Sequence, residues 1–224
     1  MKTKKEWFDS AILKEDESGT TANARHFMMN NGTRKAVFFP HNINSYNEAE
    51  KKWEPIDNAP KPTETGYAAK MGAYTATFTQ KNGNESVEVS DGTDAISWEY
   101  LGANKNMFSA FANPEGGKPT KRKSRLHVEK TVDPRGLSGS GRAVYTGAEG
   151  DIDMEYSIEG DNVKENIVVR EKSDTYRYHF LLRTAGFEMK TDSESGTVGF
   201  YKTASAAEDA ERNPAFVMPA PFMY

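Results

Sequence analysis

The stretch Ile152-Asp153-Met154-Glu155-Tyr156-Ser157-Ile158 decides the fold class of this chain. Apolar and polar residues alternate through it without a break, and successive side chains of a β-strand point to opposite faces of a sheet. One face of this strand is therefore apolar and the other is acidic, which is typical of an antiparallel sheet with one buried side. Gly160-Asp161-Asn162 then supplies turn residues, and residues 163–170 return as a second strand.

The same period of two recurs through most of the chain outside this hairpin. Asn30-Asn31-Gly32 separates residues 25–29 from residues 33–39, and Asn-Gly provides the positive φ angles that a tight hairpin turn needs. Residues 47–51 and Asn82-Gly83 separate two more pairs of apolar runs. We therefore predict an all-β protein, an antiparallel β-sandwich of two twisted sheets with a short N-terminal helix or arm.

Two boundaries divide the chain. Trp7, Phe8, Ile12 and Leu13 are spaced roughly as on a helix and are followed by an acidic, polar segment. We assign residues 1–22 to the N-terminal arm and residues 23–224 to the β-sandwich domain. Residues 113–120 are rich in Pro and Gly, so a split near 113–122 into two β subdomains is the alternative.

Composition excludes several classes of function. The 224 residues include 29 Lys and Arg and 33 Asp and Glu, which give a net charge of -4. With a pI of about 5.7, this balance argues against nucleic-acid binding, and no apolar run reaches the length of a membrane span. The chain has no Cys, which excludes disulfides, thiolate zinc sites and a Cys nucleophile. We expect neither nucleic-acid partners nor membrane insertion.

No motif points to catalysis or to a metal. Asp151, Asp153 and Glu155 share one strand face, but alternate residues on a strand lie about 6.5 to 7 Å apart, too far to ligate one ion. The segment Asp91-Gly92-Thr93-Asp94 resembles part of a calcium loop but is better interpreted as a turn. The four His form no H-x-x-x-H pair, and no G-x-S-x-G elbow is present. We expect no enzyme activity, no cofactor and no metal, with a hydrolase as the third hypothesis.

Three aromatic residues are the candidate ligand-binding residues. Trp53, Trp98 and Tyr100 could together form a flat platform that stacks on a sugar ring. In a β-rich chain, aromatic residues with a period of two are more often part of the core, and we favour that interpretation. A carbohydrate-binding module that recognises cell-surface glycans is the alternative function.

Several strings resemble a known family. Arg25-His26-Phe27, Asn31-Gly32, Ala36-Val37-Phe38-Phe39-Pro40 and Lys52-Trp53-Glu54-Pro55-Ile56-Asp57-Asn58 resemble the opening of large Gram-positive proteins with DNRLRE and RHS (YD) repeats. Val163-Lys164-Glu165-Asn166-Ile167-Val168-Val169 and residues 216–223 resemble a later stretch of the same β-rich N-terminal region. The resemblance covers the first and last thirds of the chain, and residues 80–135 fit no part of it.

The resemblance implies a non-catalytic structural or scaffolding module of a secreted or cell-surface bacterial repeat protein. It implies turn positions at Gly32 and Gly186 and core positions at Trp53 and Ile56. Residues 215–224 are apolar and aromatic to the last residue, whereas free termini are usually polar. We therefore expect the polypeptide to continue beyond Tyr224, with the adjacent domain of the same polypeptide as the partner of this apolar segment.

Overall fold

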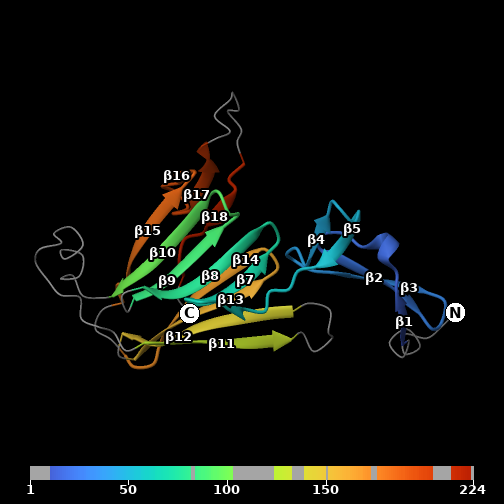
Figure 1. The fold of residues 1–224 in the computed structure, drawn as a ribbon, viewed down its shortest axis with the longest axis horizontal. Helices are drawn as coiled ribbons and strands as arrows, with labels where there is room; N and C mark the ends of the chain where they lie inside the picture. Colours follow the sequence, from blue (N-terminus) through green and yellow to red (C-terminus); the bar gives the residue numbers. More distant parts are fainter. Residues whose placement is uncertain are drawn as a thin grey trace, which may run out of the picture.

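The computed structural model describes residues 11–81, 84–102, 124–132, 139–149, 151–172, 176–203 and 213–222. Within these ranges the chain consists of antiparallel β-strands and one short 3-10 turn, η1 (Glu17–Gly19). The predicted all-β class is confirmed. Figure 1 shows a small N-terminal unit at one side of a larger body that is built of several sheets.

The N-terminal unit contains a three-stranded sheet and a separate hairpin. The sheet has the order β1-β2-β3, and the hairpin pairs β4 with β5. Residues 12–15 form a strand that pairs with β2, whereas the sequence predicts a helix or an arm there. Residues 1–10 lie outside the described residues. The bounds are β1 (Ile12–Glu15), β2 (Ala24–Met29), β3 (Arg34–Phe38), β4 (Asn44–Asn47) and β5 (Lys52–Pro55).

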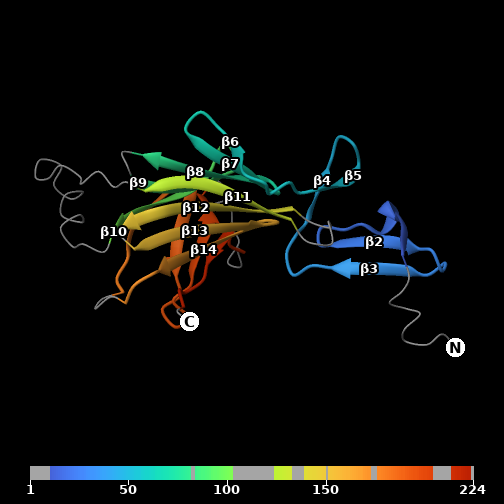
Figure 2. The ribbon, with the colours of Figure 1, turned by 90° about the horizontal axis from the view of Figure 1, so that it is seen from below.

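Two larger sheets form the central body. One has six strands in the order β15-β10-β9-β8-β7-β6, and the other has four in the order β11-β12-β13-β14. Figure 2 shows the four-stranded sheet spread side by side across one face of this body. The bounds are β6 (Lys61–Pro62), β7 (Gly66–Met71), β8 (Tyr74–Lys81), β9 (Asn84–Ser90), β10 (Ala95–Gly102), β11 (Arg125–Val132), β12 (Gly139–Glu149), β13 (Ile152–Glu159), β14 (Asn162–Val169) and β15 (His179–Ala185).

A C-terminal sheet completes the fold. It has the order β16-β17-β18, with β16 (Phe187–Thr191), β17 (Val198–Lys202) and β18 (Phe216–Met218). Phe187 and Phe200 are buried in the same core cluster as the residues of the central body. The Phe216 ring packs on Tyr74 of β8 at 4.4 Å between centroids, so this sheet is joined to the central body by aromatic contacts.

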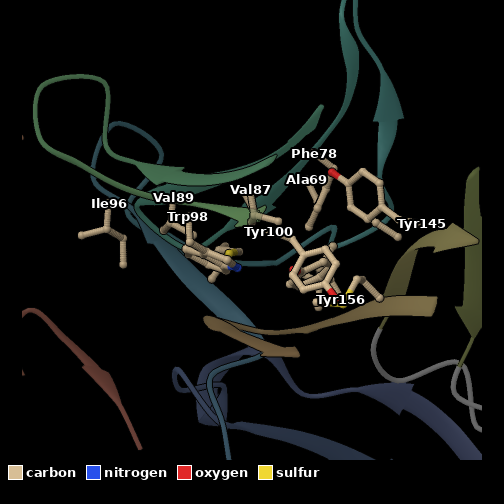
Figure 3. Packing of buried hydrophobic residues seen from close by; sticks show 14 of the residues in the cluster. Ala69, Phe78, Val87, Val89, Ile96, Trp98, Tyr100, Tyr145 and Tyr156 are labelled. Carbon is tan, nitrogen blue, oxygen red and sulfur yellow. The ribbon is translucent and has the colours of Figure 1, made fainter. Parts of the chain in front are cut away.

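The core lies between the six-stranded and four-stranded sheets. Tyr156 of β13 contacts Phe78 of β8 and Trp98 of β10, at 5.8 and 6.2 Å between ring centroids. Tyr145 of β12 packs edge-on against Tyr156 at 5.9 Å (Figure 3). The Tyr145 hydroxyl lies 2.9 Å from the carbonyl oxygen of Ser86, so it donates a hydrogen bond across the interface. These large rings bury apolar area that holds the two sheets together.

The turns match the sequence predictions where they are described. Gly32 and Gly186 both have a φ of +77°, as the family resemblance implies for turn positions. Gly160, between β13 and β14, has a φ of +62°, and a Cβ there would lie 1.7 Å from the carbonyl oxygen of Asn42. Only glycine fits this turn, because the left-handed conformation and the close approach both exclude a side chain. The predicted split near 113–122 lies outside the described residues.

Candidate functional site

Two of the three candidate ligand-binding aromatics lie in the core. Trp98 is 8% exposed and Tyr100 is 0% exposed, and both point from β10 toward the interior. Trp98 packs on Tyr156, and Tyr100 packs on Phe180 of β15 at 5.3 Å between centroids. Neither ring presents a face to the surface, so the core interpretation of these two residues is the one that the fold supports.

The third candidate, Trp53, lies elsewhere in the fold. It is half-buried on β5 in the N-terminal unit, where it pairs across the hairpin with Tyr46 of β4. The two rings meet edge to face at 5.2 Å between centroids, and Tyr46 is 42% exposed. The structure therefore does not bring Trp53 together with Trp98 and Tyr100. The surface aromatic pair is Trp53 with Tyr46, a partner that the hairpin register could have indicated.

The acidic residues of β13 are engaged within the sheet. Asp153 is buried, accepts the Gly147 N–H at 2.7 Å and forms an ion pair with Arg170. Glu155 forms an ion pair with Arg142 at 3.2 Å. These carboxylates have protein partners on neighbouring strands, and within the described ranges no group of three His, Asp or Glu is placed to hold a metal ion.

The segment at residues 91–94 forms the turn between β9 and β10, and a lysine from another sheet binds it. Lys202 Nζ of β17 lies 2.6 Å from an Asp91 oxygen and 3.0 Å from an Asp94 oxygen. The ammonium group, with help from backbone N–H groups of the turn, holds the pKa of Asp91 well below its usual range. The two carboxylates thus connect the C-terminal sheet to the central body.

An ionisable group that the sequence analysis did not single out lies inside the central body. Glu165 of β14 is directly opposite Tyr156 of β13, so both side chains point to the inner face of the four-stranded sheet. Burial raises the pKa of Glu165 to about 7, although Trp98 and Tyr156 partly offset this effect. The signal in the sequence is its place between Val163 and Ile167, on the apolar face of the strand.

Glu165 is not among the residues that line a hollow on the surface of the N-terminal sheet. A hollow of about 360 Å³ lies on the N-terminal sheet and is lined by Lys14, Glu15, Asp16, Glu17, Met28 and Arg34. Three of its charged groups form ion pairs, Arg34 with Asp16 at 3.6 Å and Glu15 with Arg25. A hydrolytic site needs a base or nucleophile inside such a hollow. Three carboxylates line this one, so a hydrolase stays a hypothesis.

The most complete polar arrangement joins the N-terminal unit to the central body. Asn58, which is 1% exposed, donates to the carbonyls of Lys70 at 2.6 Å and Gly160 at 2.8 Å. Its Oδ1 atom accepts the Gly160 N–H at 2.6 Å. Ile56, two residues before it, is 7% exposed. The segment that follows the β4–β5 hairpin is therefore fastened to β7 and to the β13–β14 turn.

The structure defines the class: an all-β protein of antiparallel sheets, in which the Asn58 hydrogen bonds and the Lys202 ion pairs join one part of the fold to another. Comparison with protein-family models, with curated proteins and with solved structures found no match. The helical residues that the structure describes include no segment long and apolar enough to cross a membrane. The resemblance to the RHS-repeat proteins therefore stays a prediction.

Proposed function

We propose that this chain is a non-catalytic structural module of a secreted or cell-surface bacterial repeat protein, and that it packs against adjacent domains of the same polypeptide. The distribution of exposed apolar side chains carries the proposal. The N-terminal sheet exposes Ile12, Leu13 and Phe38, and the C-terminal part exposes Met189, Val217 and Phe222. Exposed apolar surface of this kind marks interaction sites.

The central body contrasts with these two ends. Among the described residues from β6 to β14 whose side chains are placed, no large apolar side chain is exposed, and Tyr176, just before β15, is 44% exposed. Apolar docking surfaces that lie mainly at the two ends suit a module that is placed in series with others. The Asn58 arrangement supports the same function, because hydrogen bonds buried between two units fix the orientation in which the first is held against the second.

Cross-linking of the polypeptide, as its organism produces it, tests the proposal. We expect amine-reactive cross-links from Lys35 on β3 and Lys190 on β16 to reach residues of other domains. Lys70 and Lys164 are exposed on the central body and serve as matched controls, with links only inside this chain. Links that are spread evenly over all four lysines would contradict the docking role, and absence of the polypeptide from the extracellular and surface fractions would contradict the location.

The carbohydrate-binding alternative is supported by one observation, the Tyr46–Trp53 pair, in which Tyr46 is 42% exposed and Trp53 is half-buried. Aromatic rings at a surface can stack on sugar rings through their apolar faces. Titration of the protein with hits from a glycan array, followed by tryptophan fluorescence, tests this function. Saturable quenching in the wild type that disappears in Trp53→Ala would support it. Equal quenching in both proteins, or none in either, would exclude this hairpin as the site.

A further inference from the structure

Glu165 is half-buried as a residue, and its side chain points to the inner face of the four-stranded sheet. Its Oε1 atom is inaccessible to solvent and makes no hydrogen bond with any described residue. The indole Nε1 of Trp98 is also buried without a hydrogen bond in the described part of the chain. Figure 3 shows this nitrogen on the side of the Trp98 ring that faces Tyr156. Trp98 and Tyr156 lie close enough to the carboxyl to lower its pKa, but burial outweighs them and favours the neutral acid.

The surroundings of Glu165 offer no compensating positive charge. Within the described residues, the groups that act on its carboxyl are Tyr156 of β13 and Trp98 of β10, and both are neutral. A second carboxyl, Glu85 of β9, is 1% exposed and acts on Tyr156 from the opposite sheet. Ionisation of Glu165 would therefore place a negative charge beside neutral groups, with a second buried acid on the far side of Tyr156.

The place of β14 in its sheet makes it easier to open than an inner strand. β14 is an edge strand of the four-stranded sheet and has a ladder only with β13. Its inner residues are half-buried, whereas Met154, Tyr156 and Ile158 of β13 are fully buried. Opening of β14 breaks one ladder and leaves the other three strands paired, so it costs less than opening any inner strand.

We propose that Glu165 is a proton-operated latch on β14. With the carboxyl protonated, β14 stays packed against the six-stranded sheet; with the carboxyl ionised, β14 opens and water reaches Trp98. The pKa of about 7 in the closed state gives the pH range. An ordinary Glu has a pKa near 4.3 to 4.5. The closed state therefore binds the proton more tightly, and its advantage is lost as the pH rises from about 4.5 to 7.

Hydrogen exchange of the β14 amides tests the latch. From the two pKa values, we expect the opening equilibrium of β14 to increase roughly 70-fold between pH 5 and pH 8, after correction for the intrinsic exchange rate. Protection of β8, in the opposite sheet, provides the internal reference. In Glu165→Gln, which imitates the protonated acid in shape and charge, protection of β14 should stay constant over this range.

The matched control is Glu159→Gln, which removes an exposed carboxyl from the end of β13 and should behave as the wild type. The latch is refuted if Glu165→Gln retains the pH dependence of the wild type, or if the wild type shows none. It is also refuted if β8 and β14 lose protection equally, because the whole body then unfolds together. Should Glu165→Gln fail to fold, Glu165→Met, which is apolar and of similar length, provides the same comparison.

Discussion

Asn58→Ala is the substitution that examines how the N-terminal unit is held to the central body. The change removes three hydrogen bonds of 2.6 to 2.8 Å. It leaves the carbonyls of Lys70 and Gly160 and the Gly160 N–H in a buried site without these partners. At about 1 kcal/mol for each bond lost, and more where a buried group stays unpaired, we expect the free energy of unfolding to fall by about 3 to 5 kcal/mol.

The assay is urea unfolding followed by circular dichroism, together with hydrogen exchange at the β13–β14 turn. A loss of this size lowers Tm by roughly 10 °C for a chain of this length. Asn42→Ala is the matched control, because Asn42 contacts Asp161 of the same turn through a single exposed hydrogen bond at 2.7 Å. Its cost should stay below about 1 kcal/mol.

Asn58→Asp separates the donor from the acceptor function of this side chain. The carboxylate keeps an oxygen for the Gly160 N–H but has no N–H for the two carbonyls, and it adds a buried charge. We expect it to be at least as destabilising as Asn58→Ala. The reasoning is refuted if Asn58→Ala costs no more than Asn42→Ala and leaves exchange of the Gly160 amide unchanged.

Three further predictions address packing, turns and charge. Trp98→Ala should cost about 3 to 5 kcal/mol in urea unfolding because it leaves a cavity in the core, and a Trp53→Ala cost of equal size would contradict the difference in burial. Gly160→Ala should lower the unfolding midpoint far more than Gly32→Ala, since a Cβ at position 32 meets nothing within 4 Å; equal shifts would refute the steric argument. Lys202 lowers the pKa of Asp91 in the folded protein, so the stabilisation that this carboxylate gives is present above about pH 4 and is lost on acidification. Lys202→Met should remove this part of the pH dependence in a titration of stability against pH, and an unchanged titration would contradict the assignment.

The elements that sequence reasoning predicts are those that depend on neighbours along the chain. Alternation over residues 152–158 predicts β13, and the Asn31-Gly32 turn predicts the hairpin of β2 and β3, because side-chain direction and positive φ are local properties. The helical spacing near Ile12 and Leu13 was misleading, because pairing with β2 outweighs a short helical pattern.

Contacts between distant segments could not be predicted in this way. β10 pairs with β15, and Trp98 lies opposite Leu182, although more than eighty residues separate them. Nothing in the local pattern states which of many strands becomes the neighbour of β10. The contact between Trp53 and Tyr46 could be predicted in part from the sequence, because the hairpin that joins them is local. The exposure of the pair depends on the other segments that cover it.

By itself, the sequence determined the all-β class, most of the described turns and the division of each strand into an apolar and a polar face. Only the tertiary structure decided that Trp98 and Tyr100 are buried, that Asn58 joins two units and that the Oε1 atom of Glu165 is shielded from solvent. The physical reason is that alternation assigns a side chain to a face of its own strand. Burial, hydrogen bonding and the pKa of a carboxyl depend instead on the strands that pack against that face.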